Sequence, residues 1–462
     1  MGVSNPLSER IQSLVNYAGS YAWGPLLSLS RSTTLSLLQG IELGQLSIVD
    51  IDGTTTVCGQ QKLGNSAGAN TVYTVPKVEL RVHKETFWVR LLLFADMGFA
   101  ESYMLEEVSC FDLTAFFRLF ILNRSALSNG STLTSNLTSQ LSSLLRKTNT
   151  LATARLNIAA HYDISNAMFA AFLSPDMTYS CPIWLPTSNP AHKTETLEQA
   201  QERKLQRFID NAKIRSSDHV LEIGTGWGSF AIQAVQQTGC RVTSLTLSKE
   251  QKALAEERIA AAGLTDNIEV LLCDYRALPI PREGPYDKVV SIEMLEAVGK
   301  EFLATYFECV DKLLKKEGGV AVFQCITMPE SRYDAYASSD DFIRRYIFPG
   351  GHLPTITQLL TSIRSGSRAT LIPESVENIG PHYAKTLRLW NENFMANFEA
   401  EIKPALLEEH RGMTDKDVEL FKRKWEYYFK YCEAGFNTKT LGDVILTVGR
   451  EGAVQMMEDV PL

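Results

Sequence analysis

Apolar and polar residues follow two different patterns along the chain, and the change comes near residue 151. Beyond it, short apolar runs alternate with segments of helical character. Strands are predicted at 220–223, 241–247, 268–272, 288–292 and 320–326, with helices between them such as 249–262 and 302–315. Because a glycine-rich turn follows the first strand, the pattern predicts an open parallel α/β sheet that binds its ligand at the carboxyl ends of the strands.

The stretch from 328 to 390 interrupts this alternation and is predicted to be an inserted cap, mainly helical, over the sheet. After it, a helix through residues 425–431 precedes a final strand predicted at 443–449. The expected catalytic domain therefore runs from 151 to 462, with a Rossmann-like sheet as its centre.

The first part of the chain, residues 1–124, is predicted to be a smaller α+β domain. Residues 46–53 alternate and end on Asp-Gly, which is a hairpin signal, and residues 78–82 alternate again. Residues 87–94 are rich in large apolar side chains and are interpreted as strand core rather than as a membrane anchor. Residues 125–150, where Ser, Thr and Asn are dense, are predicted to be a linker.

Composition narrows the class of protein. The 462 residues carry a net charge of −8, which argues against a general nucleic-acid binder. The eight cysteines include no Cys-x-x-Cys pair, so reduced thiols are expected rather than disulfides or a zinc site, and no metal is predicted. No apolar run reaches transmembrane length and the start lacks a signal-peptide core, so the expected location is cytoplasmic.

Residues 219–228 (His-Val-Leu-Glu-Ile-Gly-Thr-Gly-Trp-Gly) are the most informative stretch, because they form a buried strand that enters a glycine turn. The glycines let the backbone approach a ligand that a Cβ would block. Glu222, just before the turn, is placed to meet a polar or cationic part of that ligand. An NAD site requires an acid near the end of the next strand, but that strand ends Thr-Leu-Ser at 246–248. The compressed glycine spacing therefore favours S-adenosylmethionine, which has no pyrophosphate.

Downstream polar residues fit the same ligand. Thr246 and Gln251 are candidates for its amino-acid or ribose end, and Asp274 follows the third strand where an adenine amino group is expected. Alternatively, Thr246 and Ser248 cap the helix that starts near Lys249. Capping does not exclude ligand binding.

Several motifs resemble, in their residues and in their order along the chain, those of the cyclopropane fatty acid synthases and mycolic acid cyclopropane synthases. The resemblance runs from about 156 to 447, and its motifs lie at 161–166, 177–181, 224–228, 246–251, 274–276, 291–296, 346–351 and 381–387. Residues 87–88 and 97–101 are also similar to the extra domain of full-length members that act on phospholipid. The resemblance implies a class I S-adenosylmethionine-dependent methyltransferase fold.

The reaction that this resemblance implies adds a methylene across the cis double bond of an unsaturated phospholipid acyl chain. A methyl group passes to the alkene, and a bound bicarbonate removes a proton from it so that a cyclopropane ring closes. Carried over by motif, the bicarbonate cradle is Cys181, Glu296, Gln324, Ile326 and Tyr383. In this scheme Glu296 orients the ion, Tyr383 donates to it, and Cys181 and Ile326 act mainly through their backbone.

The resemblance, the turn and the strand ends together predict the contacts to S-adenosylmethionine. These are Tyr179, Ser180, Glu222, Gly224, Thr225, Gly226, Thr246, Leu247, Gln251, Asp274 and Tyr275. A phospholipid substrate further implies peripheral contact with a membrane, and the N-terminal domain is the expected point of contact. The sequence leaves open whether the protein forms a homodimer.

Two departures from the family pattern bear on the product. Gln324 stands where many bacterial members carry His, and glutamine holds a hydrogen bond but cannot titrate. Thr225 replaces the usual Cys of the turn, which is a mild change. Gln324 keeps open a methyl-branched or methylene lipid formed through the same carbocation. A small-molecule methyltransferase is a further alternative, against which the N-terminal domain and the 346–351 motif count.

Overall fold

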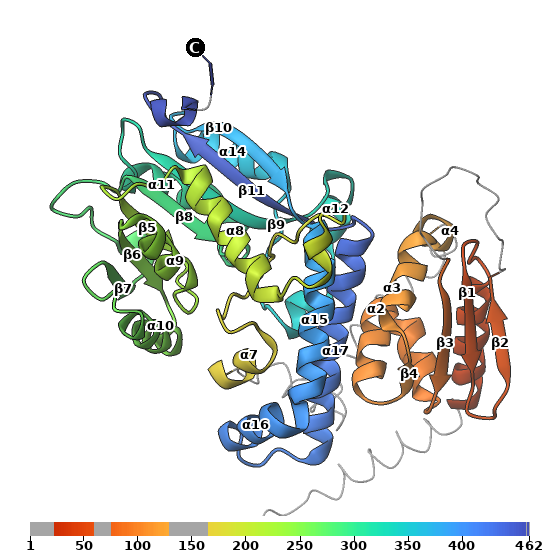
Figure 1. Cartoon of the computed structure of the whole chain (residues 1–462). Coiled ribbons are helices and arrows are strands. Elements are labelled where there is room, and N and C mark those ends of the chain that lie inside the picture. Colours follow the sequence, from red (N-terminus) through yellow and green to blue (C-terminus); the bar gives the residue numbers. More distant parts are fainter. Residues whose placement is uncertain (1–22, 60–74, 129–164, 459, 462) are drawn as a thin grey trace, which may run out of the picture. The chain divides into compact units, whose positions relative to one another are not determined.

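The computed structural model describes residues 23–59, 75–128, 165–458 and 460–461 (Figure 1). It divides into two compact units. The first contains Met1–His161 together with Thr414–Tyr427, and the second contains Tyr162–Met413 and Tyr428–Leu462. The motif at 161–166 lies largely outside the described residues, as does most of the predicted linker.

The first unit is built on a four-stranded sheet of order β2-β1-β3-β4. Its strands are β1 (Gln45–Val49), β2 (Thr55–Cys58), β3 (Lys77–Val82) and β4 (Val108–Cys110). β1 and β2 pair antiparallel, so the hairpin predicted from the Asp-Gly turn is confirmed. β3 buries every second residue, which matches the alternation of its sequence.

The interpretation of residues 87–94 as a strand is wrong, because they lie in the helix α2 (Thr86–Met104). A continuous apolar run fits a buried helix as well as a buried strand, and here the helical segment is much longer than a strand. The helix bends at Ala95, whose φ is 48°. Gly98 lies against the preceding turn, since a Cβ there would come within 2.2 Å of the Arg90 carbonyl oxygen. Two further helices follow, α3 (Leu113–Leu122) and α4 (Arg124–Ser128).

The second unit contains a seven-stranded sheet of order β10-β11-β9-β8-β5-β6-β7. The five strands predicted to be parallel are present within two residues of their expected ends: β5 (His219–Ile223), β6 (Arg241–Thr246), β7 (Ile268–Leu272), β8 (Lys288–Ile292) and β9 (Val320–Thr327). The predicted last strand is β11 (Gly442–Gly449), which pairs antiparallel to β9. The fold is the Rossmann-like sheet of class I methyltransferases.

The predicted insertion at 328–390 contains one element that the sequence pattern did not indicate. Residues 372–378 form the edge strand β10 (Ile372–Asn378), which pairs antiparallel with β11. Most of its side chains are exposed and it contains Pro373, so it lacks the apolar signature of the central strands. The rest of the stretch is helical: α12 (Glu330–Ser338), α13 (Phe342–Tyr346), α14 (Ile356–Gly366) and the start of α15 (Pro381–Asn397).

Helices cover both faces of the seven-stranded sheet (Figure 1). α11 (Leu303–Leu313) and α14 pack on one face, where Tyr306, Phe307 and Phe323 belong to a large apolar core. α8 (Leu197–Ala212) and α9 (Ser229–Thr238) pack together and contact other strands of the sheet. The remaining helices of this unit are α7 (Asn166–Phe172), α10 (Lys249–Ala261) and α16 (Lys403–Glu409).

The long helix α17 (Asp415–Asn437) contributes to both units, since residues up to Tyr427 group with the first and the rest with the second. The predicted domain limits at 124 and 150 stay predictions. Across the described ranges of the chain, no helix is both long and apolar enough to cross a membrane.

Candidate active site

The glycine-rich turn has the conformation that its composition favours. Gly224, Gly226 and Gly228 have φ angles of 106°, 51° and 87°, in the left-handed region that glycine tolerates. The backbone N–H groups of Gly224 and Thr225 donate to the carbonyl of Leu245, at 3.0 and 2.9 Å. The turn is therefore tied to the carboxyl end of β6, and it leads into α9.

Glu222 supports this turn from inside the core. Its side chain is buried, and it accepts a hydrogen bond from the hydroxyl of Ser244, which also lies 2.7 Å from the hydroxyl of Thr225. Burial raises the pKa of Glu222 to about 8, so the carboxyl keeps a proton at neutral pH. Its role as a contact to the cofactor stays a prediction.

At the carboxyl end of β6, polar side chains cap the start of the next helix, while an apolar side chain stays exposed. Ser248 is the N-cap of α10, because its hydroxyl accepts from the backbone N–H of Gln251 at 3.1 Å. Thr246 donates to the side chain of Gln251 at 3.0 Å and accepts from the backbone of Ser248 at 3.1 Å. Leu247 is 74% exposed, so this apolar side chain is free to contact a ligand. Capping thus leaves the predicted cofactor edge open.

Asp274 and Tyr275 lie at the carboxyl end of β7, where a short turn η2 (Tyr275–Ala277) begins. Both oxygens of Asp274 pair with the Arg276 side chain, and this pairing lowers the pKa of the Asp274 carboxyl. Asp274 is therefore ionised, and its predicted contact with an adenine amino group stays a prediction. The ring of Tyr275 packs edge-on against Tyr306, with centroids 5.0 Å apart.

The segment 177–181 is held by the buried face of α8. Gln201 donates to the carbonyls of Thr178 and Ser180, at 3.3 and 2.8 Å. The ammonium of Lys204 donates to the hydroxyl of Ser180 at 2.7 Å. Gln201 and Lys204 are fully buried, and burial lowers the pKa of Lys204 to about 8. This helix therefore places both the predicted cofactor residue Ser180 and the backbone that leads to the next residue, Cys181.

Aromatic rings line the same region. Tyr179 shares a hydrogen bond of 2.8 Å with the hydroxyl of Tyr428, and its ring centroid lies 5.0 Å from that of Trp390. Tyr383 packs against Trp390 and Phe436, at centroid distances of 5.7 and 4.7 Å. Trp390 is fully buried. Such ring faces stabilise a nearby positive charge.

Three of the residues predicted to cradle an anion converge on the carboxylate of Glu293. The backbone N–H of Cys181 and the side-chain amide of Gln324 both donate to its Oε1, each at 2.7 Å. The hydroxyl of Tyr383 donates to its Oε2 at 2.8 Å. Burial raises the pKa values of Cys181 and Tyr383, so the thiol stays neutral and the phenol stays a donor. Cys181 contacts Glu293 through its backbone, and its predicted role in holding bicarbonate stays a prediction.

The other two residues of the predicted cradle bind each other. The backbone N–H of Ile326 donates to Oε1 of Glu296 at 2.6 Å. Oε2 of Glu296 is buried and, within the described residues, has no hydrogen-bond partner. The backbone N–H of His352 donates to the Glu296 carbonyl at 2.9 Å and so ties Glu296 to the loop that follows α13.

Asp443 completes a group of three carboxyl groups with Glu293 and Glu296. It is fully buried on β11, and the amide of Gln324 lies 3.0 Å from its Oδ2. Burial and the charge of Glu293 raise the pKa of Asp443, and burial and the same charge raise the pKa of Glu296 to about 8. Burial also raises the pKa of Glu293, but hydrogen bonds from Asp443, Cys181 and Tyr383 oppose that effect. The donors around Glu293 therefore favour its ionised form, whereas burial and the neighbouring charge favour the protonated forms of Glu296 and Asp443.

Sequence reasoning placed no function on Glu293, Asp443 or Lys204. Glu293 follows the last residue of β8, and an acid at the carboxyl end of a parallel strand is a recognisable site signal. It was passed over because Glu296 matches the family motif three residues later. Asp443 and Lys204 carry no local signal, since their partners are distant in the sequence.

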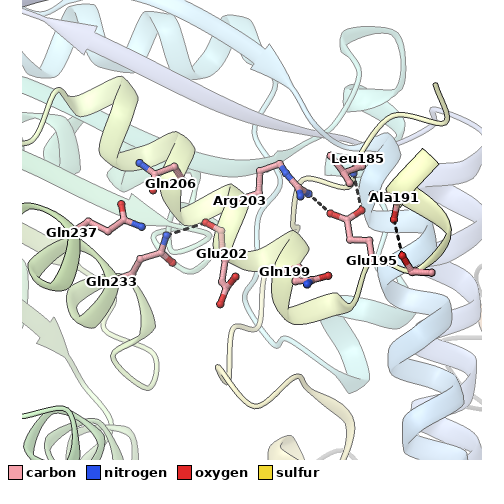
Figure 2. A pocket seen from close by; sticks show the side chains of 10 residues that line it. Leu185, Ala191, Glu195, Gln199, Glu202, Arg203, Gln206, Gln233 and Gln237 are labelled. Carbon is pink, nitrogen blue, oxygen red and sulfur yellow. Dashed lines mark hydrogen bonds and ion pairs between the residues drawn. The ribbon is translucent and has the colours of Figure 1, made fainter. Parts of the chain in front are cut away.

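A polar groove of about 570 Å³ lies along the outer side of α8 and does not include the carboxyl cluster (Figure 2). Two of its charged groups are paired with each other, since Glu195 binds Arg203, and Glu195 also accepts from the backbone N–H of Leu185 at 2.8 Å. Gln233 donates to the carbonyl of Glu202 at 3.0 Å and closes one end. The groove is lined by Leu185, Ala191, Thr194, Glu195, Gln199, Glu202, Arg203, Gln206, Gln233 and Gln237. No residue predicted for the active site is among them.

The site lies within a region that matches a known family. The family model described as mycolic acid cyclopropane synthetase matches residues 149–445. The chain belongs to this family. A tuberculostearic acid methyltransferase (UfaA1) of Mycobacterium tuberculosis is 43% identical over 300 residues, which are 65% of this chain and 66% of that protein. The cyclopropane-fatty-acyl-phospholipid synthase of Escherichia coli is 31% identical over 391 residues, 82% of this chain and 90% of that synthase.

Solved structures agree with the family and with the cofactor. The mycolic acid cyclopropane synthase CmaA1, solved with S-adenosylhomocysteine (SAH) and CTAB, superposes with a TM-score of 0.52 at 27% identity. The match covers 64% of this chain and 98% of that one. The family member described here is an S-adenosylmethionine-dependent methyltransferase, and the glycine turn with the ends of β6 and β7 is the part of the fold that suits its cofactor.

Proposed function

We propose that this enzyme transfers the methyl group of S-adenosylmethionine to a cis double bond in the acyl chain of a phospholipid and closes a cyclopropane ring. The observation that carries the proposal is the buried cluster of Glu293, Gln324 and Tyr383 beside an aromatic wall. An isolated alkene is a poor nucleophile, so the reaction needs a dry site that holds the two reactants in line. It also needs a base for the proton that is lost.

The predicted cofactor residues fit the methyl donor. Bound S-adenosylmethionine supplies an electrophilic methyl group on its sulfonium. The turn at 224–228 brings backbone close to it, Asp274 is ionised for its amino group, and Tyr179 and Ser180 are held in place by α8 and by Tyr428. The rings of Tyr179, Tyr383 and Trp390 are suited to a carbocation on the acyl chain.

A second product class is favoured by one observation. The relative at 43% identity is described as a tuberculostearic acid methyltransferase, a lipid enzyme, whereas the cyclopropane synthase relative is 31% identical. A methylene-bearing chain arises from the same carbocation when the proton is lost without ring closure, and a saturated methyl branch requires that a separate hydride donor then reduces this methylene. A phospholipid substrate also implies peripheral contact with the bilayer, which belongs to this proposal.

Lipid analysis tests the proposal directly. Expression of the full chain in cells rich in monounsaturated phospholipid is expected to yield acyl chains that are heavier by one CH₂ in the mass spectrum of their methyl esters. A ring resists mild hydrogenation, whereas an exocyclic methylene takes up one H₂. An unchanged lipid profile with intact cofactor binding would instead favour a small-molecule acceptor.

A further inference from the structure

The hydrogen-bond donors that the family resemblance assigns to bicarbonate are all engaged by carboxylates of the chain itself. Glu293 takes the backbone N–H of Cys181, the amide of Gln324 and the hydroxyl of Tyr383. Glu296 takes the backbone N–H of Ile326. A bicarbonate ion in the same place would have to displace Glu293 from its partners. The residues present therefore do not fit a separately bound ion.

The backbone holds Glu293 in this position at a cost. Its φ is 47°, in the left-handed region that non-glycine residues avoid because Cβ crowds the following carbonyl oxygen. Its N–H donates to the carbonyl of Gln324 at 3.0 Å, which fixes the residue at the carboxyl end of β8 beside β9. Strained residues of this kind are concentrated at functional sites.

The same segment lies beside the cofactor turn. A Cβ on Gly224 would be 3.4 Å from the Cβ of Met294, the residue after Glu293. The hydroxyl of Ser291, two residues before it, donates to the carbonyl of Ile223 at 2.8 Å. Both contacts place the Glu293 segment next to the residues that lead into the glycine turn.

Charge balance also opposes a free anion. Glu293, Glu296 and Asp443 already crowd one region, and Lys204 is the buried cation whose charge acts on Glu293 and Asp443. A carboxylate and bicarbonate present the same planar pair of anionic oxygens to hydrogen-bond donors. An additional anion would add repulsion to this group of acids.

We propose that Glu293 is the catalytic base of this enzyme and takes the place that bicarbonate has in the family scheme. The proposal rests on the proposed function. Methyl transfer breaks the S–CH₃ bond and leaves its electron pair on sulfur, while the alkene π pair forms the new C–C bond. Glu293 then takes one proton from the transferred methyl group. The freed C–H electron pair closes the ring, or forms a methylene, and the proton leaves to solvent.

Bicarbonate binding gives a test that does not depend on turnover. In buffer freed of carbon dioxide, titration with isotopically labelled bicarbonate is followed by NMR in the presence of S-adenosylhomocysteine. The native enzyme is expected to show no saturable binding. The Glu293→Gly variant empties the cradle and suits the positive φ, so it is expected to bind the ion. Saturable binding to the native enzyme at the cradle would overturn the proposal.

Turnover with unsaturated phospholipid vesicles gives the second test. The native rate is expected to be the same with and without bicarbonate. Glu293→Gln, which keeps the shape but not the base, is expected to lower kcat by about 100-fold or more and to leave S-adenosylhomocysteine affinity within about threefold. Glu317→Gln, on the surface, serves as the matched control and is expected to behave as native. Glu293→Gly is expected to regain activity when bicarbonate is added.

The two proposals fail in different ways. If no unsaturated lipid is methylated under any condition, the proposed function is wrong, whereas the binding titration still reports on Glu293. If lipid is methylated but the native rate depends on bicarbonate, or Glu293→Gln keeps its rate within about threefold, Glu293 is not the base.

Discussion

Buried acids determine most of the behaviour of this site at the scale of single residues. Glu222 and Glu293 both stand at the carboxyl ends of neighbouring parallel strands, yet their partners favour different protonation states. Glu222 accepts from Ser244 and keeps its proton, because burial raises its pKa to about 8. Glu293 receives N–H and O–H donors from three residues, which favour its ionised form.

The raised pKa of Glu222 predicts a pH-dependent stability. Between its unfolded pKa, near 4.5, and about 8, the folded protein keeps a proton that the unfolded chain releases. The free energy of unfolding therefore falls as pH rises through that window. Glu222→Gln removes this loss of stability with rising pH. The Tm of the ligand-free variant minus the Tm of the native protein is therefore expected to be higher at pH 8 than at pH 5, by about 3 °C or more. Parallel melting curves for the two proteins would contradict this.

At the scale of elements, the helix α8 supports the active site through the side chains on its buried face. Its outer side carries the polar groove, while Gln201 and Lys204 on its buried side hold the segment 177–181. A capping box between Thr196 and Gln199 begins the helix, so its start is well defined from local sequence. Which face meets the site follows from packing against β8 and β9.

Lys204→Met is expected to shift the pH dependence of catalysis. Removing the buried positive charge raises the pKa of the carboxyl cluster, so the base loses its proton at higher pH. The acid limb of the kcat/KM profile should move up by roughly one pH unit. Lys193→Met, on the surface, is the control and should leave the profile in place. An unmoved acid limb in Lys204→Met would show that the lysine does not act on the base.

Elements with a strong local pattern were predicted well, and those without one were not. The five parallel strands are short apolar runs between helical segments, and each was found within two residues. α2 was mistaken for a strand because a uniformly apolar run carries no period that separates the two structures. β10 was missed because its stability comes from pairing with β11 rather than from its own side chains.

At the scale of the whole molecule, the chain does not divide cleanly at a linker. The first turns of α17, up to Tyr427, belong to the first unit, where Tyr103 donates to Glu426 at 2.7 Å and Arg423 donates to the carbonyl of Tyr103 at 2.7 Å. The ring of Phe117 packs edge-on against that of Tyr427, with centroids 5.0 Å apart.

Deletion of residues 1–150 is therefore expected to harm the remaining chain. It would uncover Tyr427, which is nearly fully buried and packs against Phe99, Tyr103 and Phe117 in the full chain. We expect aggregation or a loss of several degrees in Tm, measured by size-exclusion chromatography and thermal unfolding. Tyr103→Phe, which removes one hydrogen bond, is the mild comparison and should stay monodisperse. A stable and monodisperse truncated protein would mean that the catalytic unit is independent of the first.

The sequence by itself determined the class of fold, the glycine turn and the kind of cofactor, because these depend on residues that are neighbours along the chain. The tertiary structure decided which carboxylate occupies the centre of the site. Glu293 is held by Cys181, Gln324 and Tyr383, which come from separate parts of the chain. A hydrogen bond between distant segments depends on how the strands and helices pack, and no local pattern of residues contains that information.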